Sequence, residues 1–260
     1  MEGNIVYFGE ENVPHYDLLA DSVAYTTVVK FRGEPWKAYP LIRAVSREEM
    51  KQVRIDADSK VFMSKFGERK IKENKIAYHR FIMKNFLRFY KAVPEHRFDI
   101  HRQVLQSDPA FRLMIYYQSV RGLQLDSDED IVVEFPEGEL VDLPVIVPTI
   151  QTFYDPQSGE EVKVRMVHYM EESTELRRKL EEATKETRIS PGKYGATIAT
   201  IVDHDAIVSD YENSIIKVEG YCMGSIPCGE QNVFEWKSLI PFEHMMLVMD
   251  NVQNTVAEIA

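Results

Sequence analysis

The chain has 260 residues, of which 44% are hydrophobic, 11% aromatic and 28% charged, close to the averages of globular proteins. This composition excludes a disordered chain, and the length suffices for a buried core in one large domain or two of ordinary size. No run of 18 apolar residues occurs, and the start MEGNIVYFGEEN has neither a basic leader nor a long apolar stretch. We therefore expect a soluble protein that is not secreted and has no membrane partner.

The net charge of −11 conceals two parts of opposite sign. Residues 30–121 hold 21 Lys and Arg against 10 Asp and Glu, whereas the rest of the chain holds 10 against 32. Such a division is typical of a basic part that binds a polyanion, or of basic and acidic surfaces that face one another within a fold or between copies. We favour the second interpretation, because nucleic-acid-binding proteins are more often basic overall.

A β-hairpin is predicted between residues 23 and 45. The run VAYTTVVKF (23–31) is rich in β-branched and aromatic residues, RGEP supplies turn residues, and WKAYPLIRAV follows as a second extended run. Ser46 then precedes REEMKQVRI, with Glu49 three positions on, which is the reciprocal capping pattern that begins a helix. The hairpin is expected to lead directly into helical structure.

From about residue 46 to residue 121 the pattern is helical and basic. In NKIAYHRFIMKNFLRFYKAV (74–93), apolar residues recur at spacings of three and four, which predicts one amphipathic helix that ends at Pro94. Two further helices are expected, DIHRQVLQ (99–106) and PAFRLMIYYQSVRG (109–122), since Pro109 suits a helix start and Gly122 a helix end. These elements complete a first domain, residues 1–122.

The second domain, residues 123–260, is expected to be acidic and to mix antiparallel strands with helices. The polar segment LQLDSDED marks the boundary, and a hairpin is predicted for TIQTFY and EVKVRMVHY around DPQSGE. Further strands are predicted in IVVEFP, ELVDLPVIVP, ATIATIV and SIIKVEGY, and helices in 170–187 and in FEWKSLIPFEHMMLVMDNVQ, the last broken at Pro241. The fold class is therefore α+β: an N-terminal β-hairpin that feeds a basic helical subdomain, then an antiparallel-β and helix C-terminal part.

Both cysteines lie in the turn-like segment GYCMGSIPCGE (220–230). Structural zinc sites need two ligand pairs spaced two to four residues apart, whereas five residues separate Cys222 from Cys228 and only His244 follows them. Redox pairs favour a two-residue gap at a helix start, and a reducing cytoplasm keeps such thiols reduced. We interpret the cysteines as small residues of a partly buried turn; the alternative is a metal clip completed by His204 or by another chain.

The best lead towards an enzyme is the order of His168, His204, Asp205 and Asp250, which resembles the ligand order of HD-type metal phosphohydrolases. Those enzymes place their ligands on helices, whereas His168 ends a predicted strand and DHDAIVSD (203–210) follows a β-branched run suited to a strand end. A metal-dependent phosphohydrolase therefore stays as an alternative. No acid and base pair, phosphate-binding loop or nucleophile elbow emerges from the sequence.

A second alternative is a nucleic-acid-binding adaptor built on the basic helical part. Its cations would contact phosphates and its aromatic rings would stack on bases, although the same spacing fits a core stripe with a solvated face. The cations are Lys60, Lys65, Arg69, Lys70, Lys72, Lys75, Arg80, Lys84, Arg88 and Lys91, and the interleaved aromatic residues are Phe62, Phe66, Tyr78, Phe81, Phe86 and Phe89.

The segment VVKFRGEPWKAYPLIRAVSREEMKQVRI (28–55) resembles the opening of tail and baseplate assembly proteins of contractile-tailed bacteriophages. In that class a short hairpin around a Gly-containing turn leads through an Arg-Pro-Leu-Thr-Arg-x-Glu-like stretch into helices; here the order is looser, from Pro40 to Glu49. The segment VFEWKSLIPFEHMMLVMD (233–250) is similar to a helix, Leu-Pro and helix segment near the end of such proteins. Together the two segments cover about 45 residues, and neither carries chemistry.

This resemblance implies a non-enzymatic structural or assembly protein of a phage tail or baseplate, in the virion or, during assembly, in the host cytoplasm. It would act without a cofactor, through contacts with other structural proteins or with copies of itself. The narrow apolar stripe of residues 170–187 would seat a partner, and the candidate anchors are Phe234, Trp236, Leu239 and Phe242. The alternative for these four residues is that they fill the local core.

Overall fold

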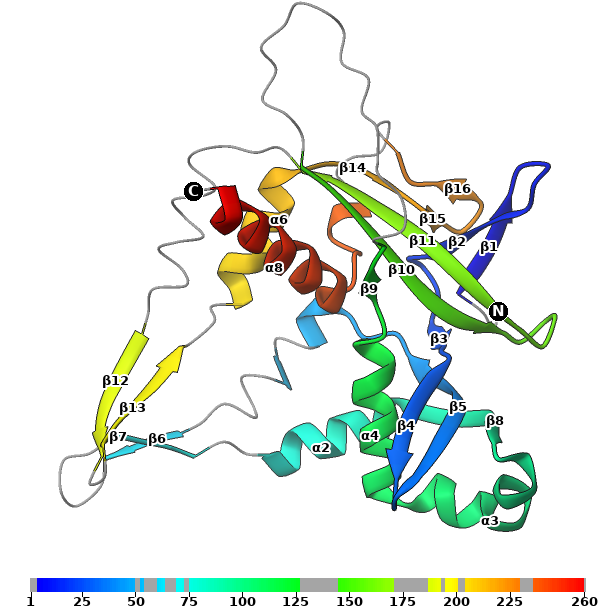
Figure 1. Ribbon diagram of the computed structural model, residues 1–260, viewed down its shortest axis with the longest axis horizontal. Helices are drawn as coiled ribbons and strands as arrows, with labels where there is room; N and C mark the ends of the chain where they lie inside the picture. Colours follow the sequence, from blue (N-terminus) through cyan, green and yellow to red (C-terminus); the bar gives the residue numbers. More distant parts are fainter. Residues whose placement is uncertain are drawn as a thin grey trace, which may run out of the picture. The chain divides into compact units, whose positions relative to one another are not determined.

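A computed structural model describes residues 4–49, 52–53, 60–63, 69–72, 75–126, 145–170, 187–192, 195–200, 204–229 and 236–259. The described residues form both helices and antiparallel sheets, so the predicted α+β class is confirmed (Figure 1). The chain divides into two compact units, the first formed by residues 1–122 and 151–164 and the second by residues 123–150 and 165–260. Among the described residues, no helix combines the length and the apolar character needed to cross a membrane.

The first unit is built around the predicted hairpin, strands β4 (Thr27–Phe31) and β5 (Glu34–Arg43). Phe31 pairs with Glu34, so the connection has two residues, Arg32 and Gly33, both with positive φ (51° and 84°). Positive φ at both positions gives the tight turn whose twist matches that of the strands. Two further strands complete the sheet: β3 (Ser22–Ala24) pairs with the end of β5, and β8 (Phe86–Val93) pairs along its other edge.

Strand β5 is buried on both faces. Alternate residues of a strand point to opposite sides of the sheet, so each face of β5 contributes to a different cluster. Trp36, Ala38 and Ile42 belong to the larger core, which the helices of the first unit cover. Tyr39 and Leu41 belong to a smaller cluster on the other side, packed against Tyr154. The long strand therefore holds two hydrophobic clusters together.

Three helices complete the first unit: α2 (Lys75–Asn85), α3 (Glu95–Ser107) and α4 (Pro109–Val120). Helix α3 packs on β8, and α4 packs on β4 and β5. The predicted start of α4 is confirmed, since Asp108 caps it by accepting hydrogen bonds from the backbone N–H groups of Ala110 (2.9 Å) and Phe111 (3.1 Å). Pro109 occupies the first helical position, where its missing N–H costs nothing.

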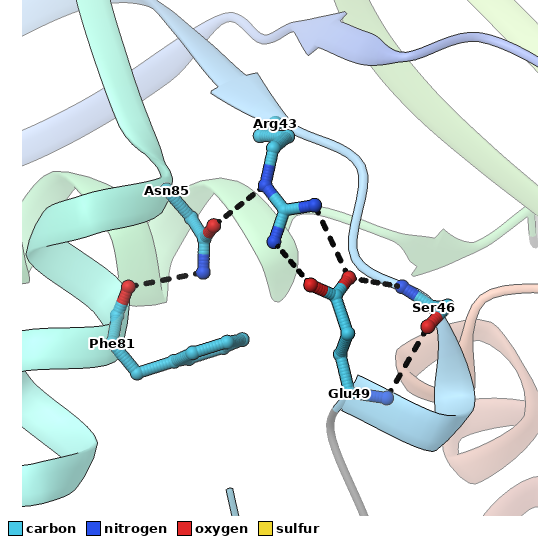
Figure 2. Close-up of polar contacts among 5 residues, drawn as sticks. All are labelled: Arg43, Ser46, Glu49, Phe81 and Asn85. Carbon is cyan, nitrogen blue, oxygen red and sulfur yellow. Dashed lines mark hydrogen bonds and ion pairs between the residues drawn. The ribbon is translucent and has the colours of Figure 1, made fainter.

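The capping pattern predicted at Ser46 is also confirmed, and it belongs to a larger polar network (Figure 2). Glu49 N–H donates to Ser46 Oγ (3.2 Å), and Ser46 N–H donates to Glu49 Oε2 (3.3 Å). The Arg43 guanidinium donates to both Glu49 oxygens (2.8 and 3.1 Å) and to Asn85 Oδ1 (2.8 Å), while Asn85 donates to the carbonyl of Phe81 (3.0 Å). These bonds join the end of β5 to the following helical residues and to the last turn of α2.

Two predictions for residues 46–93 were wrong. The helix expected over 74–93 ends at Asn85, and residues from Phe86 onward form strand β8. Strands β6 (Lys60–Met63) and β7 (Arg69–Lys72) lie within the segment expected to be helical, and they form a separate antiparallel hairpin. An N-terminal hairpin, β1 (Ile5–Phe8) with β2 (Val13–Asp17), was not predicted.

The predicted hairpin of β10 (Val145–Asp155) and β11 (Glu160–Met170) is confirmed. Its residues 145–150 and 165–170 belong to the second unit, and the connecting residues 151–164 belong to the first. Strand β9 (Gln124–Leu125) pairs with β10, and β14 (Ile215–Glu219) pairs with β11, giving the order β14-β11-β10-β9. Buried positions alternate with more exposed ones along the middle of β11. This alternation gives the sheet a core-facing side.

The remaining elements of the second unit are two short hairpins and two helices. The hairpins are β12 (Thr187–Gly192) with β13 (Gly195–Thr200), and β15 (Tyr221–Met223) with β16 (Ile226–Pro227). The helices are α6 (His204–Ser214) and α8 (Phe242–Ile259), and α8 begins just after Pro241, where a helix break was predicted. The helix predicted for 170–187 lies almost entirely outside the described residues.

Candidate functional site

A buried cluster of two histidines and a tyrosine lies inside the second unit. His168 comes from β11, Tyr221 from β15 and His244 from α8, and none of the three is more than 4% exposed. The Tyr221 hydroxyl lies 3.0 Å from His168 Nε2 and 2.8 Å from His244 Nδ1. One hydroxyl therefore joins two imidazoles from different elements.

Burial keeps both imidazoles of this His-Tyr-His cluster neutral. Desolvation, together with the neighbouring His244, lowers the pKa of His168 to about 3, and desolvation lowers the pKa of His244 to about 3 as well. The hydroxyl has one proton, so it donates to one ring nitrogen and accepts from an N–H of the other ring. The three side chains therefore form a fixed chain of hydrogen bonds. His168 Nε2 and His244 Nδ1 are both occupied by the Tyr221 hydroxyl.

The four residues of the HD-type pattern are found in different surroundings. His168 is fully buried in β11, whereas Asp250 is exposed on α8, where partial desolvation raises the pKa of its carboxyl. The β-branched run before DHDAIVSD forms strand β13, as expected, and His204 and Asp205 then open helix α6. The buried positions Ile207, Asp210, Tyr211 and Ser214 show the helical spacing that the β-branched residues before them concealed.

No group of three or more His, Cys, Asp or Glu that could hold a metal ion is found among the residues that the structure describes. The two cysteines lie at the β15–β16 hairpin: Cys222 is buried opposite Pro227, and Cys228 is half-buried just after β16. The two side chains are thiols and form no disulfide, and Cys228 N–H donates to the carbonyl of Tyr221 (2.8 Å). The backbone of this turn therefore helps to position the tyrosine of the buried cluster.

The four candidate anchors for a partner are not equivalent. Trp236 is fully buried, and its indole N–H donates to the carbonyl of Gly229 (3.3 Å). Leu239 is 38% exposed and Phe242 is half-buried at the start of α8, while Phe234 lies outside the described residues. Of the three anchors that the structure describes, Leu239 and Phe242 have solvent-accessible side chains and Trp236 does not.

The basic part of the first unit forms ion pairs within the unit. Arg43 binds Glu49, and three further pairs join residues distant in sequence: Arg32 with Asp108, Lys37 with Glu161, and Arg97 with Glu34. Other cations lie over aromatic rings, such as Lys91 over Tyr39 and Tyr154. Many of the cations noted in the sequence therefore interact with carboxylates or aromatic rings of the same unit.

The aromatic residues proposed to stack on bases are mostly not available for it. Phe86 and Phe89 are 4% and 1% exposed and belong to the larger core, while Phe81 is half-buried. Phe66 lies outside the described residues, and for Phe62 and Tyr78 only the backbone is described. Exposed cations remain on α2, at Arg80 and Lys84.

The outer face of α3, which we define by Ile100 and Val104, is an exposed apolar surface. The helix buries only Phe98 and Leu105, whereas Ile100 is 74% exposed and Val104 59%. These two residues are one helical turn apart, so they lie next to each other on the helix. Composition gave no signal for this surface, because only the fold shows which side of α3 faces the core.

No protein-family model matches the chain, and comparisons with curated proteins and with solved structures find no significant similarity. Function must therefore be argued from the residues and surfaces described above.

Proposed function

We propose that this chain is a structural or assembly protein of a contractile phage tail or baseplate, and that it acts through protein–protein contacts and not by catalysis. The observation that carries the proposal is the outer face of α3. A surface helix that serves only its own core carries polar residues on the side away from that core. Here Ile100 is the most exposed of the large hydrophobic side chains described, and Val104 extends the same face.

Burial of this face against a partner would be favourable. Removing an aliphatic side chain of this size from water contributes about 1.5–3 kcal/mol when burial is complete. Polar residues one helical turn away border the pair, including Arg97, which binds Glu34, and Gln103. An apolar centre with a polar rim is the usual composition of a protein interface.

A second observation supports the same proposal. Strands β6 and β7 form one sheet of only two strands, and β12 and β13 form another, with no third strand among the described residues. A two-stranded sheet alone is marginally stable in water, and a hairpin of this kind gains stability when it packs on another surface. Assembly proteins provide such surfaces.

The two alternative functions have weaker support from the site. An HD-type phosphohydrolase would need an imidazole of His168 for its metal, but this ring is fully buried and its Nε2 is hydrogen-bonded to Tyr221. A nucleic-acid adaptor would need free cations beside free aromatic rings, whereas Phe86 and Phe89 are in the core. Protein contact is the function that the described surfaces fit best.

The test uses phage particles that are assembled in cells where the natural copy of this chain is removed and a tagged copy is expressed in its place. The wild-type chain should be recovered in purified tails in a fixed ratio to the other tail proteins, measured by quantitative mass spectrometry. The double variant Ile100→Glu/Val104→Lys should be recovered at least ten-fold less. The matched control Ile76→Lys changes another exposed aliphatic helical residue, 65% exposed on α2, and should be recovered like the wild type.

Two results would overturn the proposal. One is the formation of complete, infectious tails without the chain. The other is a purified protein with one bound divalent metal ion per chain, lost together with phosphoester hydrolysis in the variant His204→Ala, which would establish the phosphohydrolase.

A further inference from the structure

The outer edge of strand β4 is open. β4 pairs with β5 on one side, and no strand lies along its other side among the described residues. Val28, which is 59% exposed, and Lys30 lie on this strand with their side chains in solvent. An open edge presents backbone N–H and C=O groups that another extended chain can bind.

The hairpin turn decides which backbone groups of β4 point outwards. In a two-residue hairpin the residues that flank the turn form a hydrogen-bonded pair, here Phe31 and Glu34. Every second residue of β4, counted back from Phe31, therefore bonds to β5. Val28 and Lys30 are the residues in between, so their N–H and C=O groups point away from β5. These groups have no hydrogen-bond partner among the residues that the structure describes.

The residues just before β4 show that this edge accepts a strand. Tyr25 N–H donates to the carbonyl of Pro40 in β5 (2.9 Å), whereas Thr26 N–H donates outwards to the carbonyl of Thr152 (3.4 Å). Tyr25 also pairs with Phe153 through a single bridge. This pairing with β10 does not continue into β4. The fold therefore pairs the edge beside Thr26 and leaves the five residues of β4 open.

Lys30 is the main protection of this edge. Natural edge strands are protected by β-bulges and by charged side chains, lysine above all. β8, on the other edge of β5, pairs with two register shifts, whereas β4 pairs with β5 without any. Lys30 is the one charged residue of β4, and none of the ion pairs formed by the described residues includes it. The charge of Lys30 therefore decides which segments fit this edge.

A second copy of β4 does not fit. Antiparallel pairing of two copies about Val29 would bring Arg32 of one turn beside Thr26 of the other copy, where Thr152 already lies. Pairing about Lys30 avoids this overlap but sets the two Lys30 side chains directly opposite each other, which is destabilising. A short acidic segment meets neither obstacle, because it can end before Thr26 and its carboxylate would face Lys30.

We propose that the open edge of β4 binds an extended acidic segment of another protein by β-strand addition, with a carboxylate opposite Lys30 and an apolar side chain opposite Val28. Backbone hydrogen bonds to Val28 and Lys30 supply the affinity, and the two side chains select the sequence. Lys37, opposite Val28 on β5, is already paired with Glu161, which leaves Lys30 as the cation for the segment. The inference rests on the proposed function for the source of the segment, which is another tail or baseplate protein.

The test is an NMR titration of the full chain with two peptides that are acetylated and amidated at their ends. Thr-Glu-Thr-Val-Thr, bound antiparallel, places its glutamate opposite Lys30 and its valine opposite Val28, and Thr-Lys-Thr-Val-Thr reverses the charge. The glutamate peptide should shift the amide signals of Val28 and Lys30 and bind about ten-fold more tightly than the lysine peptide. It should also slow the hydrogen exchange of these two amides, which attraction between charges alone would not do.

Val28→Pro tests the backbone contact. The substitution removes one outward N–H, and proline is tolerated on an edge strand where the N–H faces solvent, so the pairing of β4 with β5 should remain. Binding of the glutamate peptide should fall about ten-fold or more. The matched control Val28→Thr keeps the N–H and a β-branched side chain, and it should bind within about two-fold of the wild type.

Lys30→Glu tests the charge and leaves the backbone intact. It should reverse the preference, so that the lysine peptide binds about ten-fold more tightly than the glutamate peptide. Circular dichroism shows whether each variant is folded, and Lys30→Glu keeps the test decisive if Val28→Pro does not fold.

Three outcomes would overturn the inference. They are unchanged amide signals of Val28 and Lys30 with the glutamate peptide, equal affinity of the two peptides for the wild type, and self-association of the wild type that Val28→Pro abolishes. The last outcome would show that a second copy occupies the edge.

The source of the segment is tested in purified tails. A carbodiimide should join the Lys30 amine to an Asp or Glu of another tail protein, identified by mass spectrometry. Tails that hold the wild type in a fixed ratio, but show no such product and recover Val28→Pro at wild-type amounts, would reject this inference and leave the proposed function standing. Peptide binding at the β4 edge, combined with absence of the wild-type chain from tails, would do the reverse.

Discussion

The hydroxyl of Tyr221 lies 2.8 Å from Nδ1 of His244 and is buried with it inside the second unit. The same oxygen lies 3.0 Å from Nε2 of His168, so a single atom joins strand β11, strand β15 and helix α8. In a dry interior each of these polar atoms must be satisfied by a protein partner. The cluster therefore fixes the relative positions of three elements within this unit.

Tyr221→Phe should be strongly destabilising. The substitution keeps the ring but leaves one buried ring nitrogen and one buried N–H without their shared partner, which costs about 3 kcal/mol in the free energy of unfolding. Urea denaturation followed by the fluorescence of Trp236, in a Trp36→Phe background, reports on the second unit alone, because the chain has two tryptophans.

The matched control for this variant is Tyr169→Phe. The Tyr169 hydroxyl donates to Glu219 (3.1 Å) in a half-buried position, and Glu219 keeps its bond to Lys217. We expect a loss of about 1 kcal/mol or less. Equal losses for the two tyrosines would contradict the role given to the buried cluster.

The stability of the second unit should fall steeply on acidification. Both histidines have a pKa of about 3 in the folded chain, below the ordinary value of 6.5, so the unfolded chain binds more protons between these values. Their contribution is fully present above pH 6.5 and is lost as the pH falls towards 3. Near pH 5 two such groups give a slope of about 2.7 kcal/mol per pH unit.

The slope separates these histidines from the other titrating groups. The measurement is the free energy of unfolding between pH 5 and 6. In a His244→Gln variant it should change by about 1.4 kcal/mol less per pH unit than in the wild type, because unfolding then takes up one proton fewer. An unchanged slope in His244→Gln would show that this ring is charged in the fold.

Part of the fold follows from local sequence signals. The turn at Arg32 and Gly33, the cap at Ser46 with Glu49, and the Asp108-Pro109 helix start all depend on residues within four positions of one another. Tertiary contacts do not change what such residues favour, and the structure confirms each of them.

Strand β8 shows why the rest was not predicted. Its buried residues Phe86, Phe89 and Ala92 are three positions apart, which is a helical spacing and not the two-residue spacing of a regular strand. The cause is its pairing with β5, which shifts register twice along its length. Each shift adds a residue, so the inward positions fall further apart.

The buried cluster was beyond sequence reasoning for a different reason. His168, Tyr221 and His244 are separated by 53 and 23 residues, and they meet only because β11, β15 and α8 pack together. One signal was present: His168 continues the inward alternation of Val164 and Met166, which places it in the core. Sequence alone could not supply its partner.

Arg43→Lys should weaken the network at the end of β5 shown in Figure 2. A single ammonium cannot hold both Glu49 oxygens and Asn85 Oδ1 in the way that the planar guanidinium does. The hydrogen bonds from Arg43 are the largest cause that lowers the Glu49 pKa. We expect this pKa to rise in the variant when it is followed by NMR, with a stability loss of about 1 kcal/mol because the pair is partly exposed.

The control for Arg43→Lys is Arg32→Lys. Arg32 also binds a carboxylate, that of Asp108 (2.8 Å), but its side chain is 71% exposed and makes one bond. The expected loss is about 0.5 kcal/mol or less. A Glu49 pKa that does not move in Arg43→Lys would mean that the guanidinium geometry is not what stabilises this carboxylate.

Gly220→Ala should be the most damaging of the glycine-to-alanine changes at the glycines of the second unit for which the structure describes the surroundings. Gly220 joins β14 to β15 with φ of 76°, and a Cβ at this position would lie 2.0 Å from the carbonyl oxygen of Arg165, which is backbone and cannot move aside. Strain from the positive φ adds about 1–2 kcal/mol to the cost of moving the strands apart, so the total should be about 3 kcal/mol or more.

Gly224→Ala separates the two effects, because its φ is 62° but no atom lies within 4 Å of the new Cβ. It should lose only about 1–2 kcal/mol by the same Trp236 denaturation measurement, and equal losses at the two glycines would show that β11 does not approach Gly220 this closely.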